Sequence, residues 1–305
     1  MTVQQSQLTL GPVLFNWAPE VWRDFYFRIA DEALVETVYL GEAICSKRAP
    51  LYEPHLAEVS ERLTRAGKTV VYSSLSEVMS KLDRDLVESL CAAEGLVEAN
   101  DGSALYYLRG RAHHVGPFIN AYNERSLAVL ARNGASNLCL PPEMPGTAIA
   151  ALAPAAEQLG LSLEVQVFGR IGLALSARCY HARAHGRTKD SCRFVCEEDP
   201  DGMVLRTIEN APFLVVNGIQ TLSHDYLNLV GELTDLEGAG VRRFRLSPHS
   251  CDMVEVAEIF RAALDGRLDA AEATERLAAL KLAAPFSNGF FHGKAGHSFV
   301  HAGRA

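Results

Sequence analysis

The chain has 305 residues, a formal net charge of −8, and 48% hydrophobic and 22% charged residues, as expected for a folded globular protein with a sizeable core. The acidic balance argues against an extended nucleic-acid-binding surface, which requires clustered Lys and Arg, but it leaves room for a small basic pocket. The chain has no run of eighteen apolar residues, and no Lys or Arg precedes the apolar residues of MTVQQSQLTLGPVLF. We therefore expect neither a transmembrane helix nor a signal peptide, and we predict a cytoplasmic protein that binds no nucleic acid.

Short apolar segments rich in β-branched and aromatic residues alternate with segments of helical periodicity. Strands are expected at residues 8–15, 37–41, 69–73, 96–99, 115–119, 137–140, 162–168 and 243–247. Helices are expected at residues 19–31, 56–63, 79–90, 127–130, 147–159, 253–264 and 271–280, with another beginning at about residue 224. The segment SALYYLRGRAH shows no clear helix. The third expected helix carries an apolar stripe formed by Met79, Leu82, Leu86 and Leu90.

Eight strands alternating with about seven helices predict an α/β chain folded as a (β/α)8 TIM-type barrel, with allowance for local distortion. The alternative is a doubly wound open sheet, but its dinucleotide-binding form is disfavoured because no Gly-x-Gly-x-x-Gly follows the first strand. The sequence shows no internal repeat or interdomain linker. We expect one domain over residues 1–305, with an insertion at 169–220 after the seventh strand and a C-terminal tail at 283–305.

Seven cysteines in a chain expected to be cytoplasmic indicate free thiols, because structural disulfides are rare in that compartment. Cys179, Cys192 and Cys196 lie in the insertion, and Cys45 follows the second strand. The loops after the strands of a (β/α)8 barrel gather at one face, so Cys45 can complete a group of four thiols. Cys251, just after the eighth strand, is the rival fourth member. The remaining two cysteines are expected in the core; they are Cys91 and Cys139.

A group of thiols in such a chain indicates a metal site more strongly than coincidental burial. Structural zinc sites usually contain two close cysteine pairs, but the spacing here is long and then C-x12-C-x3-C. Four thiolates at irregular spacing fit an iron–sulfur cluster better, and nearby basic residues could offset the negative charge of a 4Fe–4S cluster. Taken singly, each such basic residue is expected to be a solvated surface charge. The candidates are Arg178, Arg183, Arg187 and Lys189, followed by Lys47 and Arg48.

Two alternative functions use the same thiols differently. A thiolate paired with His181 or His249 would make a peptidase, although the sequence has no local nucleophile signature. A zinc-stabilised scaffold without chemistry is the second alternative. Under every alternative, the residues that would act as acid or base stay unassigned.

Other polar residues occur where a barrel could use them. Glu164 and Gln166 share a face of the seventh strand and are placed to point into the barrel. The segment FFHGKAGH is placed to close over the barrel mouth, with His292 and Lys294 contacting an anionic group, and a disordered basic tail is the alternative. The pair His113-His114 is expected in a loop before the fifth strand.

Five segments together resemble one family: VYLGEAICSKR, EVQVFGRIGLALSARCYHAR, CRFVC, GIQTLS and the terminal NGFFHGKAG. They are similar to the collagenase-like peptidase superfamily, and within it to members that work in oxygen-independent ubiquinone biosynthesis. The similarity extends over nearly the whole chain, and the cysteine pattern is its most specific part.

The resemblance implies a heterodimer with a UbiU-like homologue, contacts with other ubiquinone-biosynthesis proteins, and hydroxylation of the ubiquinone ring without dioxygen. A small molecule such as prephenate is the implied oxygen donor. The superfamily's peptidases have a cysteine soon after a Phe-Gly segment, where this chain has Gly172, Leu173 and Ala174, so peptidase activity is not expected. The resemblance further implies a 4Fe–4S cluster bound by Cys45, Cys179, Cys192 and Cys196.

Overall fold

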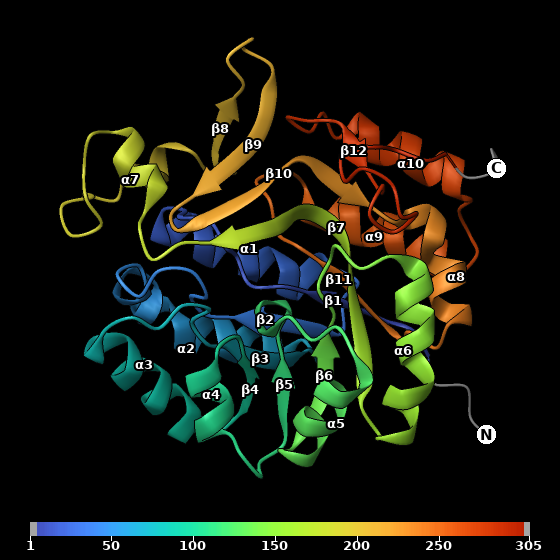
Figure 1. Ribbon diagram of the computed structural model, residues 1–305, viewed down its shortest axis with the longest axis horizontal. Coiled ribbons are helices and arrows are strands. Elements are labelled where there is room, and N and C mark those ends of the chain that lie inside the picture. The colour runs from blue at the N-terminus through green and yellow to red at the C-terminus, as the bar shows by residue number, and fades with distance from the viewer. Residues whose placement is uncertain (1–4, 302–305) are drawn as a thin grey trace.

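Eight parallel strands form a closed barrel in the computed structural model, which describes residues 5–301 (Figure 1). The barrel closes because β11 hydrogen-bonds to both β1 and β7, while the strands between them pair in sequence order. The predicted (β/α)8 barrel is confirmed. Its strands are β1 (Gln7–Leu10), β2 (Thr37–Leu40), β3 (Thr69–Ser73), β4 (Leu96–Ala99), β5 (His113–Val115), β6 (Ala135–Cys139), β7 (Ser162–Leu175) and β11 (Arg243–Leu246).

Helices cover the outside of the barrel. In α1, Trp22, Tyr26 and Ile29 are buried at helical spacing, and Pro19 occupies the first turn, where its missing N–H has no helical partner to lose. No helix within residues 5–301 is long and apolar enough to cross a membrane. The outer helices are α1 (Pro19–Glu32), α2 (Ala49–Arg65), α3 (Lys81–Ala92), α4 (Gly102–Tyr107), α5 (Glu124–Arg132), α6 (Gly146–Gln158), α8 (Leu233–Gly238), α9 (Met253–Leu264) and α10 (Ala270–Ala279).

Two expected strands extend too far along the chain. The first ends at Leu10 because the following Gly11-Pro12 interrupts the strand, and Pro12 has no N–H for a ladder. The fifth is β5, which ends at Val115, and a 3₁₀ turn (Pro117–Ile119) replaces its expected second half. The pair His113-His114 therefore lies in the strand, and its expected position in a loop is wrong.

Two segments have a different secondary structure from the expected one. The segment without a clear helix contains α4, which is capped by the Asp101 carboxylate accepting from the N–H groups of Ser103 and Ala104. The helix expected from about residue 224 is instead the strand β10 (Gln220–Asn228). It pairs with the far half of β7, a distant contact that local periodicity cannot reveal.

The insertion grows from the seventh strand, as predicted. Beyond Phe168, β7 leaves the barrel and pairs antiparallel with β10, which continues to β9 (Pro212–Asn217) and β8 (Met203–Arg206). This sheet projects from the carboxyl ends of the barrel strands, with α7 (Tyr180–Ala184) beside it (Figure 1). The β9–β10 hairpin has a two-residue turn with Gly218 first, at φ +61°, as a type II′ turn requires.

The helix α3 turns a different face to the core than its apolar stripe suggests. A capping box between Ser80 and Asp83 starts the helix, and the face that continues from Asp83 through Val87 to Cys91 is the buried one. The expected stripe lies at the edge of this face, and Leu82 is 62% exposed. Leu82 is thus a member of the apolar stripe that does not pack in the core.

Replacing Val87 by Ala should lower the free energy of unfolding by about 2 kcal/mol, because Val87 is 1% exposed and two buried methyl groups are lost. The change Leu82→Ala should alter it by no more than about 0.5 kcal/mol. Urea unfolding of the two variants measures both values. A larger loss for Leu82→Ala than for Val87→Ala would contradict the observation that the Val87 face of α3 is the buried one.

The barrel interior is polar and is centred on Arg245. Its Nη2 lies 2.6 Å from Glu98 Oε1, and its Nε lies 3.0 Å from Glu164 Oε1. Its guanidinium carbon also lies 4.0 Å from the ring centroid of Tyr39. Each barrel strand contributes one side chain to this connected group, which comprises Thr9, Tyr39, Ser73, Glu98, His114, Asn137, Glu164 and Arg245.

Glu164 accepts hydrogen bonds from more side chains of this group than any other member does. Its Oε2 accepts from Asn137 Nδ2 at 2.6 Å and from the Tyr39 hydroxyl at 2.7 Å. Burial raises the pKa of Glu164, but the positive charges of Arg245 and then Arg243 outweigh burial and hold the pKa well below its ordinary value. Glu164 is therefore a carboxylate at neutral pH, and its charge is balanced inside the barrel.

The change Glu164→Gln should lower the free energy of unfolding at pH 7 by roughly 3–5 kcal/mol, because it leaves a buried guanidinium with one charged partner fewer. The folded-state pKa of Glu164 lies below the unfolded value of about 4.3, so its contribution is complete above that pH and is lost as the pH falls. Urea unfolding at pH 7 and pH 3 should therefore show a smaller difference between variant and wild type at pH 3. An equal difference at both pH values would argue against an ionised Glu164.

Candidate functional site

The structure brings together the three cysteines of the insertion and Cys45. Cys45 lies in the β2–α2 loop, Cys179 caps α7, and Cys196 lies in a 3₁₀ turn (Val195–Glu198) after Cys192. The Cys179 side chain packs against Ala43, Ile44 and Ile219, and so against the loop that carries Cys45. All four are free thiols.

The thiols are close enough to influence one another electrostatically. Burial raises the pKa of Cys179, and the neighbouring Cys45 and Cys192 raise it further against the lowering effects of the Ala182 N–H and Arg48. Burial likewise raises the pKa of Cys196, with further contributions from Cys179 and Cys192. A positive charge at this point would stabilise the thiolate forms.

Two cations from the β2–α2 loop contact these sulfurs. Arg48 Nη2 lies 3.6 Å from Cys196 Sγ, and Lys47 Nζ lies 3.8 Å from Cys192 Sγ. Lys47 also donates to the Lys189 carbonyl at 2.8 Å, which ties the insertion to this loop. Arg48 is 1% exposed, although it has one of the largest side chains in the protein.

The basic residues of the insertion are placed differently from those of the β2–α2 loop. Arg178 and Arg183 are exposed, as expected for solvated charges, and Arg187 donates to the Cys192 carbonyl at 3.1 Å. The sequence ranked the insertion residues first, yet Lys47 and Arg48 make the sulfur contacts. Their position two and three residues after Cys45, in the sequence CSKR, was the available signal.

The other cysteines lie elsewhere. Cys91 and Cys139 are buried in the core, as predicted. Cys251 Sγ lies 3.7 Å from Met253 Sδ, and burial, followed by the charge of Asp201, raises its pKa to about 12. The structure therefore groups Cys45, rather than Cys251, with the thiols of the insertion.

The four thiols match the donor set of an iron–sulfur cluster. Within residues 5–301, no three His, Cys, Asp or Glu side chains are arranged to hold a single metal ion. A 4Fe–4S cluster takes one Cys thiolate on each iron, so its sulfur ligands stand further apart than those of one ion. Three half-buried thiols and the buried Cys196, with two adjacent cations, suit such a cluster, which carries net negative charge.

Neither histidine considered as a thiol partner contacts a cysteine sulfur among the described residues. His181 Nε2 lies 2.9 Å from Asp199 Oδ2, and His249 Nε2 accepts from the Arg170 N–H at 3.0 Å. Burial lowers the pKa of both rings, with their Asp partners opposing the change. The thiol–imidazole pair that a cysteine peptidase requires is not formed in this part of the chain.

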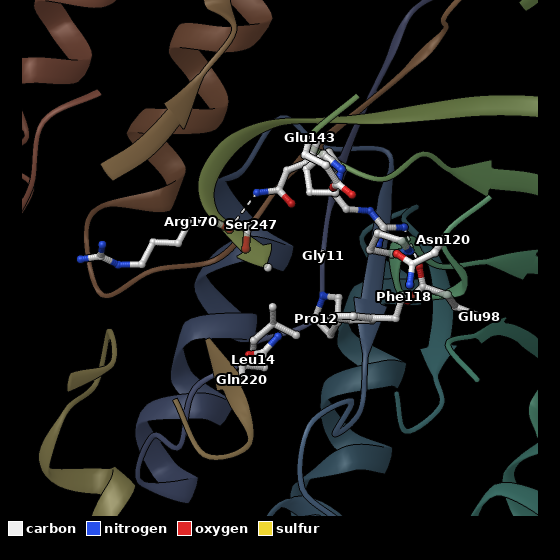
Figure 2. Close-up of a pocket in the computed structure, with 15 residues that line it drawn as sticks. Gly11, Pro12, Leu14, Glu98, Phe118, Asn120, Glu143, Arg170, Gln220 and Ser247 are labelled. Carbon is white, nitrogen blue, oxygen red and sulfur yellow. Dashed lines mark hydrogen bonds and ion pairs between the residues drawn. The ribbon is translucent and has the colours of Figure 1, made fainter. Parts of the chain in front are cut away.

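A small cavity of about 60 Å³ lies at the mouth of the barrel, where the carboxyl ends of the strands meet (Figure 2). Gln166 lines it and Glu164 lies in the barrel interior, so both point inward as predicted. Figure 2 shows Leu14 and Gln220 on one side, Glu98, Phe118 and Asn120 on another, and the Arg170 guanidinium directed away. The sequence missed Glu98 and Arg245, although charged residues inside expected strands were a usable signal.

The cavity and the cysteines share a wall. Leu14 and Phe118 line the cavity and also pack against Ala43, Ile44 and Ile219, beside Cys179. The Leu14 carbonyl accepts from Arg48 Nη1 at 2.9 Å. The cavity and Cys179 therefore border the same apolar cluster, with Leu14 and Phe118 on the cavity side.

The C-terminal tail does not close over the cavity. His292 Nε2 lies 2.9 Å from Glu232 Oε1, and the Gly146 N–H donates to the Phe291 carbonyl, which holds the tail against α6. The described residues of the tail, including Lys294, do not line the cavity, so their expected place at the barrel mouth is wrong. These contacts hold the described part of the tail against the outside of the barrel.

Comparison with known proteins places the chain in a family. The family model described as Peptidase family U32 matches residues 23–300. Among solved structures, the chain is similar to phospho-2-dehydro-3-deoxyheptonate aldolase from Thermotoga maritima, with 12% identity, 92% of this chain and 72% of that chain covered, and a TM-score of 0.45. It is also similar to dihydropteroate synthase from Thermus thermophilus (14% identity, 87% and 94% covered, TM-score 0.43) and to the U32 peptidase Mk0906 (11% identity, 82% and 96% covered, TM-score 0.44). Since the family match covers most of its length, the chain belongs to peptidase family U32.

Proposed function

We propose that this chain is a 4Fe–4S protein with a UbiV-like role, acting with a UbiU-like partner in oxygen-independent hydroxylation of the ubiquinone ring. The grouping of four thiols from two distant segments around two cations carries the proposal. The proposed reaction follows from the resemblance of the cysteine segments to members of the collagenase-like peptidase superfamily that work in oxygen-independent ubiquinone biosynthesis. The proposed cluster ligands are Cys45, Cys179, Cys192 and Cys196.

The chain's own residues have two tasks under this proposal. Arg48 and Lys47 offset the negative charge of the thiolates, and the half-buried setting limits access of water to them. A bound cluster would supply one-electron transfer. The barrel-mouth cavity would receive a group of the ring or of an oxygen donor such as prephenate, oriented by the polar side chains of Gln166, Gln220 and Ser247.

Under this proposal the cavity would lie near the cluster, and no residue is assigned as an acid or a base. The cavity is too small for a whole ring, since a 150 Å³ cavity accommodates benzene, and this one has about 60 Å³. A substituent such as a carboxylate or carbonyl group would enter, and the remainder of the molecule would lie outside. The partner subunit is the natural candidate to cover it.

Protein reconstituted under anaerobic conditions should be brown and contain about four iron atoms per chain. The iron content and the visible absorbance should fall in each single Cys→Ala variant of the proposed ligands, which are Cys45, Cys179, Cys192 and Cys196. The control variant Cys251→Ala should leave both unchanged. Iron and sulfide analysis with absorbance spectroscopy provides the measurement. Colourless, iron-free wild type would refute the proposal, and stoichiometric zinc without redox activity would favour the scaffold alternative.

Generic peptides should not be hydrolysed, because the thiols lack an imidazole partner within the described residues and burial raises the pKa of Cys45, Cys179 and Cys196. A fluorogenic peptide assay of the wild type and of Cys179→Ala tests this. Turnover by the wild type that disappears in the variant would instead establish a thiol peptidase.

A further inference from the structure

We propose that Arg48 is the positioning residue of the cysteine site, a buried cation that holds Cys196 in place and raises the reduction potential of the cluster. The inference rests on the proposed function, since it needs a bound cluster. It assigns to one side chain outside the thiols a role that can be measured separately from catalysis.

The charge of Arg48 is incompletely balanced by the protein around it. A buried guanidinium normally pairs with a carboxylate at hydrogen-bonding distance, but Glu42 Oε2 lies 3.8 Å from Arg48 Nη1. The other oxygen, Glu42 Oε1, accepts from the N–H groups of Ile44 and Cys45 at 2.7 and 2.9 Å. Among residues 5–301, neither Arg48 Nε nor Glu42 Oε2 has a hydrogen-bond partner. The positive charge of the guanidinium is therefore available to interact with a further anionic group.

The anionic groups nearest to Arg48 would be the thiolates. Nη2 lies 3.6 Å from Cys196 Sγ, and the charge of Arg48 also acts on Cys45 and Cys179. Positive charge and hydrogen bonds at cluster sulfurs stabilise the more negative, reduced state, and so raise the potential. The effect depends on burial, because water would screen an exposed cation.

Contacts from two distant parts of the fold fix the position of the guanidinium. The Leu14 carbonyl after β1 accepts from Nη1 at 2.9 Å, and Asn217 Oδ1 at the end of β9 accepts from Nη2 at 3.0 Å. The β9–β10 turn then covers the group with Gly218, where a Cβ would stand 2.8 Å from Arg48 Nη2. A larger residue at this position would push against the guanidinium.

Lys47 has a different role from Arg48 at the cysteine site. Its Nζ is 3.8 Å from Cys192 Sγ, but it also donates to the carbonyls of Lys189 and Asp190 at 2.8 and 3.2 Å. It is partly exposed, so its main effect is to tether the insertion loop. The larger electrostatic effect on the cluster belongs to Arg48.

Redox titration of the reconstituted protein, followed by absorbance or electron paramagnetic resonance, tests the inference. Arg48→Met should shift the midpoint to a more negative potential, and Arg48→Lys should restore part of the shift. Arg183→Met is the matched control, because it removes the same charge from an exposed position in α7 and should leave the midpoint nearly unchanged. Gly218→Ala keeps the charge but displaces the guanidinium, so it should give a smaller negative shift.

The possible outcomes distinguish a failure of this inference from a failure of the proposed function. Suppose that Arg48→Met is loaded with iron to the wild-type level and still shows the wild-type midpoint potential. The proposed role of Arg48 is then wrong, and the proposed cluster is not affected. If Arg48→Met does not fold, unchanged midpoints in both Arg48→Lys and Gly218→Ala overturn the inference. If the wild type binds no iron, the proposed function fails and this inference fails with it.

Discussion

The ion pairs of Arg245 with Glu98 and Glu164 are the interaction on which the rest of the structure depends. They join β11, β4 and β7 across the barrel interior, where a lone charge would be costly. Because the same β7 continues out of the barrel into the sheet of the insertion, the position of the cysteines depends on how this strand is held. A polar barrel interior thus helps to position a sheet that lies outside the barrel.

The cysteine site illustrates how a barrel can gather distant residues. Cys45 comes from the β2–α2 loop and the other three from the insertion, and Lys47 bridges the two by binding both a carbonyl and a sulfur of the insertion. The same loop supplies Arg48, whose carbonyl partner Leu14 lines the barrel cavity. Redox chemistry at the thiols and binding at the barrel mouth would therefore share structural elements.

The sequence predicted the features that depend on local pattern. Alternating apolar segments located the barrel strands, and the clustered cysteines of the insertion marked three of the four thiols that the fold brings together. The sequence pattern alone left Cys45 and Cys251 open as the fourth. The strand β10 was mistaken for a helix because its partner is the distant half of β7. The burial of Arg48 was equally hidden, since Leu14 and Asn217 are far from it in sequence. The face of α3 was misjudged because the capping box at Ser80 fixes the start of the helix, whereas packing fixes which face is buried.

The separation of the cysteines along the chain has a consequence for biogenesis. Cys45 and the insertion become neighbours only after β2 and β7 have taken their places in the closed barrel, because neither segment reaches the other through local structure. Loading of a cofactor at this site would therefore follow folding rather than drive it, in contrast to small zinc domains that fold around their metal.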